Sequence, residues 1–263
     1  MAFKNFKPSL GIWGSPWYGF NHFQRFFGSY QVWDLFRNTI TLSLYQIIAS
    51  FPLPILLALI LNYTTIPKLK KIGQTATYAP HLISVVVLAG MLIVFCSPRG
   101  LFNQILGIFG VNPSPLLGNS SLYQSIYVWS TVWQRTGYNA VLYIAALTAV
   151  SDELHEAATI DGANKFQRVW HIDIPAILPT IMILLIMSVG NLMSIGFEKS
   201  FLLQNDLNLG RSEIIATYVY KIGIQSAQYS YATAIGMINN VINFALLVTV
   251  NRISRRLTGN SLW

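Results

Sequence analysis

The sequence predicts an all-α polytopic membrane protein, and three observations lead to that class. Of its 263 residues, 53% are apolar and 10% are charged, whereas about a quarter of a soluble domain is charged. The mean hydropathy is +0.49, and the apolar residues gather in stretches of the roughly 20 residues that a helix needs to cross a bilayer. The basic residues, which give a net charge of +8, cluster at the ends of these stretches as topology signals do. We therefore expect a lipid bilayer as the environment and no nucleic-acid partner.

Five spans are predicted, and they are predicted to be helices because each is continuously apolar, whereas a barrel strand alternates over about 10 residues. They lie at about 39–61, 76–96, 122–150, 174–197 and 231–250. Together they define a transmembrane domain over residues 39–263. Pro52 and Pro54 fall inside the first span, where a proline bends a helix. That bend is open to two interpretations, a packing kink or a functional bend beside a pathway.

The orientation follows from basic residues close to the span ends. Lys68, Lys70 and Lys71 follow the first span, and Arg252, Arg255 and Arg256 follow the last. Both sites would be cytoplasmic, which places loop 151–173 in the cytoplasm and makes residues 1–38 an extracytoplasmic N-terminal segment. Residues 1–38 contain no apolar core of a signal peptide. We therefore expect that an N-terminal span is missing from this chain.

Loop 151–173 carries five of the nine acidic residues. Ser151 followed by acidic residues is typical of a helix N-terminus, and Gly162 suits a sharp bend between two short helices. Pro175 fits the start of the next span, where its missing N–H costs little. From these features alone, the loop either packs on its own bundle or presents a face to a partner.

The spacing within this loop resembles a known motif. Glu156-Ala157-Ala158, three further residues, Gly162, nine further residues and Ile172-Asp173-Ile174-Pro175 resemble the EAA loop of ABC importer permeases. Ile174 in place of Leu is the one departure. The stretches SPWYGFNHFQRFF, FPLPILLALILN and YSYATAIG are similar to the binding-protein-dependent sugar permeases. The resemblance implies a type I ABC importer permease-like helical bundle, with five spans here and the family's first span missing.

The resemblance also implies a function and partners. The chain would be a permease subunit in a bacterial inner membrane that passes a sugar or oligosaccharide received from an extracytoplasmic solute-binding protein. A second permease subunit, commonly a different chain, and two cytoplasmic ATPase subunits would complete the importer. The EAA loop would be a coupling helix in a cleft of the ATPase, and the residues implied in that contact are Glu156, Ala157, Ala158, Asp161, Gly162 and Phe166. The alternatives are a permease for amino acids or peptides and, from another class, a membrane enzyme or scaffold.

Catalytic and metal-binding residues are not predicted. The sequence contains no Gly-Lys pair, so the phosphate-binding loop G-x-x-x-x-G-K-[ST] is absent. We expect no cofactor on this chain, with ATP and Mg bound by the partner ATPase. Four histidines are scattered along the chain, and Thr159 replaces the second histidine of an H-E-x-x-H pattern at His155.

Polar side chains inside the spans are the candidates for a substrate pathway, because polar groups in hydrocarbon usually face a bundle interior or water. The predicted lining is Trp133, Arg135, Asn139, Tyr143, Asn191, Asn239 and Asn243. Aromatic faces and planar hydrogen-bonding groups suit a sugar, and a guanidinium can pair with an acidic one. In the alternative interpretation, Arg135 reaches the outer interface or an acidic neighbour such as Glu198. The aromatic residues would then pack between helices or form a belt at the membrane interface. The asparagines would form hydrogen bonds between helices.

Overall fold

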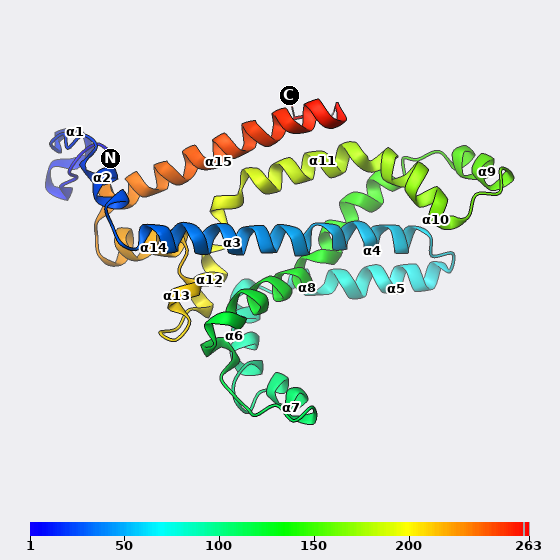
Figure 1. Cartoon of the computed structure of the whole chain (residues 1–263), viewed down its shortest axis with the longest axis horizontal. Helices are drawn as coiled ribbons and strands as arrows, with labels where there is room; N and C mark the ends of the chain where they lie inside the picture. Colours follow the sequence, from blue (N-terminus) through cyan, green and yellow to red (C-terminus); the bar gives the residue numbers. More distant parts are fainter. Residues whose placement is uncertain (260, 263) are drawn as a thin grey trace. The chain divides into compact units, whose positions relative to one another are not determined.

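The computed structural model describes residues 1–259 and 261–262, without the side chains of residues 257 and 258, and this part of the chain is helical and contains no β-strand (Figure 1). The all-α prediction is therefore confirmed. The chain forms two compact units, each made of three separate stretches. Unit 1 contains Met1–Tyr45, Val85–Tyr127 and Gly190–Leu246, and unit 2 contains Gln46–Ser84, Val128–Val189 and the stretch from Leu247.

Unit 1 is built from short helices around the first part of three long ones. The long helices that begin in it are α3 (Val32–Ser50), α8 (Ser120–Leu147) and α15 (Tyr229–Thr258). The short elements are η1 (Pro8–Leu10), α1 (Gly11–Gly14), α2 (Asn21–Phe27), α6 (Val85–Phe95), α7 (Leu101–Ile108), η3 (Leu116–Gly118), η5 (Leu192–Ser194), α12 (Phe197–Leu203), α13 (Leu209–Ser212), α14 (Ile215–Tyr220) and the π-helical turn η6 (Lys221–Gln225). Buried amide groups hold these pieces together. The side chain of Asn38 on α3 donates to the carbonyl groups of Gly210 and Glu213, at 3.0 Å each.

Unit 2 contains the remainder of the long helices and the 151–173 segment. Its own elements are α4 (Pro52–Asn62), α5 (Pro67–Tyr78), η2 (Ala79–Leu82), α9 (Asp152–Ile160), α10 (Lys165–Arg168), the π-helical turn η4 (Val169–Asp173) and α11 (Ile174–Gly190). Its core is a cluster from α4, α8 and α11 that includes Ala58, Ala140, Tyr143 and Ile177. Small residues among large ones let membrane helices approach closely.

Three described helices are long and apolar enough to cross a membrane: Val32–Asn62, Lys165–Gly190 and Tyr229–Arg256. A fourth span results if Pro67–Leu82 and Val85–Phe95 are counted together. Helix α8 has the length for the predicted fifth span, with 28 residues, but Gln134, Arg135 and Asn139 make it more polar than the others. Its place in the bilayer stays a prediction.

The span predicted at 76–96 is not one continuous helix. The helix tightens into η2 and ends at Leu82, Ile83 is extended with φ −76° and ψ 127°, and α6 begins only at Val85. Pro80 supplies a physical reason, because a proline removes a backbone donor from the helix. The side-chain amide of Gln134 on α8 donates to the carbonyl of Ile83 at 2.8 Å, which satisfies one group that the break exposes.

The span predicted at 174–197 also has different ends. The helix does not start afresh at Pro175, because helical structure runs from Lys165 through the π-helical turn η4 into α11. It ends at Gly190, and residues 191–196 form a turn that contains η5. At the first span, by contrast, Phe51 keeps a helical conformation between α3 and α4 (φ −80°, ψ −46°), so Pro52 and Pro54 do not end the helical path.

Candidate functional site

The 151–173 segment begins with a capped helix. The hydroxyl of Ser151 accepts a hydrogen bond from the backbone N–H of Glu153 at 3.2 Å, and Asp152 and Glu153 occupy the first turn of α9. Both features stabilise a helix N-terminus, so the predicted start is confirmed. Glu156, Ala157 and Asp161 are exposed on this helix, and Ala158 is half-buried.

Gly162 makes the turn between α9 and α10, as predicted. Its φ is +80°, in the region that residues other than glycine adopt at a cost. Its N–H donates to the carbonyl of Thr159 at 3.1 Å, and the N–H of Ala163 donates to that of Ala158 at 2.8 Å. This pair of bonds is a Schellman motif. A Cβ at Gly162 would meet nothing within 4 Å, so backbone conformation and not space requires glycine here.

Helix α10 follows at once and has a capping box, in which Asn164 and Gln167 exchange hydrogen bonds of 2.9 and 2.8 Å. The segment exposes large apolar side chains: Ile160 and Phe166 are 87% and 75% exposed, and Leu154 and Trp170 are also exposed. Two shallow hollows of about 310 and 520 Å³ flank α9 and share Arg168 in their linings. A rigid surface with apolar residues, carboxylates and hollows is suited to binding another protein.

A buried carboxylate anchors this surface to the rest of unit 2. The side chain of Asp173 in η4 has no exposed area, and its Oδ2 accepts a hydrogen bond of 2.7 Å from the hydroxyl of Tyr63 at the end of α4. Nε2 of His155 on α9 lies 3.3 Å from Oδ1. Neither residue is predicted from the sequence as part of a site, because Asp173 occupies the unspecified position of the motif and Tyr63 lies 110 positions away from it.

The predicted pathway residues of α8 do not share one face. Trp133 and Arg135 are exposed, but two residues apart on a helix differ by about 200° in direction. Asn139, one turn after Arg135, is half-buried, whereas Tyr143 is only 2% exposed and lies in the core of unit 2. Arg135 and Asn139 can therefore act together, and Tyr143 packs the helices.

An aromatic pair missed by the sequence analysis lies beside these two residues. The ring of Tyr138 stacks on that of His81 with centroids 4.0 Å apart and planes 12° apart. The pair forms where α5 and α8 touch at Gly137, since a Cβ there would lie 2.7 Å from the backbone nitrogen of Tyr78. The available signal was His81, the one histidine within the span predicted at 76–96.

The three predicted asparagines lie in unit 1 and have different surroundings. Asn243 is 9% exposed, accepts from the N–H of Met193 at 2.9 Å and donates to the hydroxyl of Ser194 at 2.8 Å. It therefore fits the helix-bonding interpretation. Asn191 is exposed at the end of α11. Asn239 is half-buried, and its Oδ1 is buried without a hydrogen-bond donor among the described residues; a place in the pathway stays a prediction for this residue.

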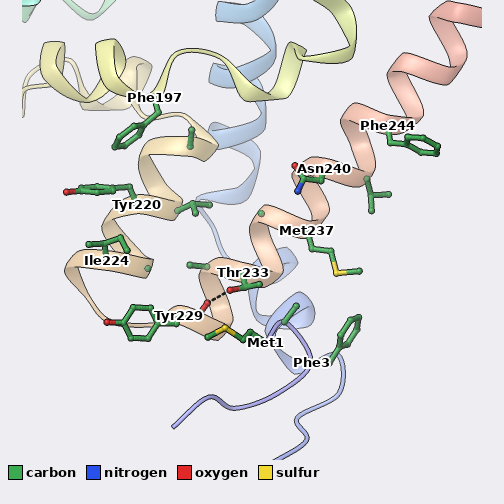
Figure 2. Close-up of a pocket in the computed structure, with 17 residues that line it drawn as sticks. Met1, Phe3, Phe197, Tyr220, Ile224, Tyr229, Thr233, Met237, Asn240 and Phe244 are labelled. Carbon is green, nitrogen blue, oxygen red and sulfur yellow. Dashed lines mark hydrogen bonds between the residues drawn. The ribbon is translucent and has the colours of Figure 1, made fainter. Parts of the chain in front are cut away.

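A wide groove in unit 1 is apolar in character. It has a volume of about 1070 Å³, lies between α14–η6 and α15, and is closed near one end by Met1 and Phe3 (Figure 2). Figure 2 shows Phe197, Tyr220, Met237 and Phe244 along it, with Asn240 and Thr233 as its few polar side chains. Thr233 is bonded to the carbonyl of Tyr229 at 2.6 Å. The groove offers few of the polar groups that fix a sugar.

These features define a class: a multi-pass helical membrane protein that presents a capped, partly apolar helical surface at residues 151–173. Among the described residues, no group of three or more His, Cys, Asp or Glu side chains could hold a metal ion. Residues 26–259 match the family described as binding-protein-dependent transport system inner membrane component. The chain belongs to this family, so it is a transport permease subunit of an inner membrane, as the sequence analysis predicted.

Similar proteins agree with this assignment. The chain is 37% identical to the polygalacturonan/rhamnogalacturonan transport system permease protein YteP of Bacillus subtilis (strain 168), over 97% of this chain and 80% of that protein. The crystal structure of a bacterial ABC transporter involved in the import of the acidic polysaccharide alginate contains a similar chain. It has a TM-score of 0.90 and 37% identity, over 92% of this chain and 85% of that one. A second structure is that of a bacterial alginate ABC transporter in complex with an alginate pentasaccharide-bound periplasmic protein. A chain in it matches with a TM-score of 0.90 and 36% sequence identity, over 93% of this chain and 85% of that one.

Proposed function

We propose that this chain is one of two different permease subunits of an ATP-driven importer for acidic oligosaccharides. An extracytoplasmic binding protein delivers the solute, and two cytoplasmic ATPase subunits bind ATP and Mg. The permease family supports the transport role. The relatives for polygalacturonan and alginate support a saccharide that carries carboxylates.

The observation that carries the coupling part of the proposal is the surface of the 151–173 segment. Glu156, Ala157 and Asp161 are exposed on α9, while Phe166 projects from α10 on the far side of the Gly162 turn. Small residues permit close approach of a partner, the apolar side chains supply buried area on docking, and the carboxylates can pair with basic groups. We assign this surface to the ATPase contact, with Ala158 and Gly162 setting its shape.

Arg135 supports the acidic substrate. It is the one charged residue between 122 and 150, it is exposed, and Asn139 follows it on the same helical row. A charge within a span is costly unless it faces a pathway or a partner. A guanidinium binds a carboxylate in a bidentate manner, so this row would bind a uronate residue during passage.

The coupling test compares two glycines with the same backbone conformation. Gly162 and Gly110 have φ of +80° and +79°, and a Cβ at either would meet nothing within 4 Å. Gly162→Leu and Gly110→Leu therefore carry a similar strain, but only the first lies in the proposed ATPase contact. In proteoliposomes with the complete importer, Gly162→Leu should lower ATP-driven uptake of a labelled oligogalacturonate at least 10-fold, and Gly110→Leu should not. Equal uptake in the two variants would contradict the assignment.

The substrate test uses charge. Arg135→Gln should lower uptake of the oligogalacturonate at least 10-fold and leave uptake of its carboxyl-reduced, neutral counterpart unchanged. Arg135→Lys, which keeps the charge without the planar fork, should have an intermediate effect. Parallel loss of both solutes would mean that Arg135 has a structural partner. Transport of amino acids or peptides instead of either saccharide would refute the substrate class.

A further inference from the structure

Three segments that are distant in sequence meet at the buried carboxylate of Asp173. Tyr63, the C-cap residue that follows α4, donates a hydrogen bond from its hydroxyl to Oδ2 of Asp173 at 2.7 Å. His155 approaches Oδ1 from α9 with Nε2 at 3.3 Å, a close contact that lacks the geometry of a well-formed hydrogen bond. Asp173 itself lies in η4, directly before α11. The end of α4, the exposed helix α9 and the start of α11 are thus joined at one side chain. We call Tyr63, His155 and Asp173 the Asp173 tie.

The chemistry of the tie favours a fixed arrangement. A buried carboxylate is stable only when donors replace the water it has lost, and a hydrogen bond to an ionised oxygen is short and strong. Burial raises the pKa of Tyr63 above its ordinary value, and its hydrogen bond to Asp173 raises it further. The phenol therefore stays protonated and remains a donor at physiological pH.

One row of helix α9 makes the contacts with Asp173 and with α10. His155 and Thr159 are one turn apart, so they lie on the same row. His155 contacts Asp173, and Thr159 accepts a hydrogen bond of 3.0 Å from Nη1 of Arg168. The guanidinium of Arg168 also lies over the ring of Tyr63, 5.8 Å from its centre. Glu156 follows His155 and Ile160 follows Thr159 in the sequence, and both Glu156 and Ile160 are exposed. This row of α9 is therefore held by Asp173 and Arg168, while Glu156 and Ile160 remain accessible to a partner.

We infer that the Asp173 tie transmits displacement of α9 to α4 and α11, so that Tyr63, His155 and Asp173 are positioning residues for ATP-driven transport. The inference rests on the proposed docking of α9–α10 on the ATPase. Without the tie, α9 is connected to α8 by the turn at 148–151, and to α10 by the turn at 161–164 and the exposed hydrogen bond between Thr159 and Arg168. Turns of this kind bend under load, so movement of α9 would be absorbed before it reaches α11.

The test removes one hydroxyl from the complete importer. Tyr63→Phe deletes the donor to Asp173 and keeps the ring under Arg168. Thr64→Val, at the next position, deletes a hydroxyl whose hydrogen bond of 2.8 Å goes to the carbonyl of Ile60 on α4 and not to Asp173. In proteoliposomes we expect Tyr63→Phe to lower uptake about 5- to 10-fold, with ATP hydrolysis kept within about 2-fold, so that ATP consumed per solute rises at least about 2.5-fold. Thr64→Val should leave this ratio unchanged.

Variants of the carboxylate separate transmission from folding. Asp173→Asn keeps an acceptor for Tyr63 and should retain a large part of the coupling, whereas Asp173→Leu should lose it. Loss of uptake and hydrolysis in parallel, with a lower melting temperature, would overturn the inference, and so would a normal ratio in Tyr63→Phe. Copurification of the ATPase with the permease, compared with and without the 151–173 segment, tests the proposed docking separately. If the ATPase binds without the 151–173 segment, the proposed function fails; if it binds there and Tyr63→Phe stays coupled, only the tie is refuted.

Discussion

Replacing Gly137 by alanine should push two helices of unit 2 apart. The backbone of α8 approaches that of α5 so closely at Gly137 that a Cβ would overlap the carbonyl of Thr77 and lie 2.7 Å from the nitrogen of Tyr78. These are backbone atoms, so no side chain can rotate away. Overpacking lowers the free energy of unfolding by typically 1–3 kcal/mol. Because this clash is with backbone atoms, we take the upper value of about 3 kcal/mol. Alanine returns about 1 kcal/mol of helix propensity, which leaves a net loss of about 2 kcal/mol.

Gly90 on α6 provides the matched control, because a Cβ there would meet nothing within 4 Å. Gly90→Ala should gain up to about 1 kcal/mol from helix propensity. At roughly 2–4 °C per kcal/mol for a chain of this size, thermal unfolding in detergent should show Gly137→Ala lower by about 4–8 °C and Gly90→Ala unchanged or slightly higher. Equal melting temperatures would refute the close approach of α5 and α8, and with it the placement of His81 beside Tyr138.

Three further predictions concern single side chains. Ser151→Ala should cost about 1 kcal/mol at the start of α9, seen as faster amide exchange in residues 152–160. Asn243→Leu leaves two polar groups without their partner and should lower the free energy of unfolding by about 1–3 kcal/mol, whereas Asn240→Leu, on the exposed face, should be nearly neutral in the same detergent unfolding assay. Burial raises the pKa of Tyr63. The stabilising hydrogen bond of its hydroxyl is therefore fully present below the ordinary pKa of tyrosine and is lost only as the pH rises through the raised value. The amount of ATP consumed per solute should consequently stay constant from about pH 7 to 9.

Local signals in the sequence were sufficient for the 151–173 segment. Ser151 before two acidic residues predicts a helix start, and Gly162 at the end of that helix predicts a turn, because both depend on groups a few residues away. The structure has both features. The spacing of Glu156, Gly162 and Pro175 also identified the family. Partners that are remote in sequence could not be predicted in this way: Tyr63 and Asp173 are 110 positions apart.

The pathway was harder to predict because composition does not tell which way a side chain points. Tyr143 and Arg135 lie on the same helix, yet one is buried in the core and the other is exposed. Asn243 has its amide occupied by the turn after α11. The break at Ile83 was missed because Pro80 lies in a stretch without Asp, Glu, Lys or Arg, where hydropathy alone predicts an uninterrupted span.

Site-specific photo-crosslinking tests the central claim most directly, namely that α9 and α10 contact the ATPase. A benzoylphenylalanine is placed at Ile160 or Phe166, which are 87% and 75% exposed, and at Ile108, which is 80% exposed on α7, as the control. After irradiation of the assembled importer, positions 160 and 166 should give an adduct with the ATPase subunit, and position 108 should give none. An adduct from position 108 alone, or the absence of adducts from 160 and 166 in an importer that transports, would contradict the account.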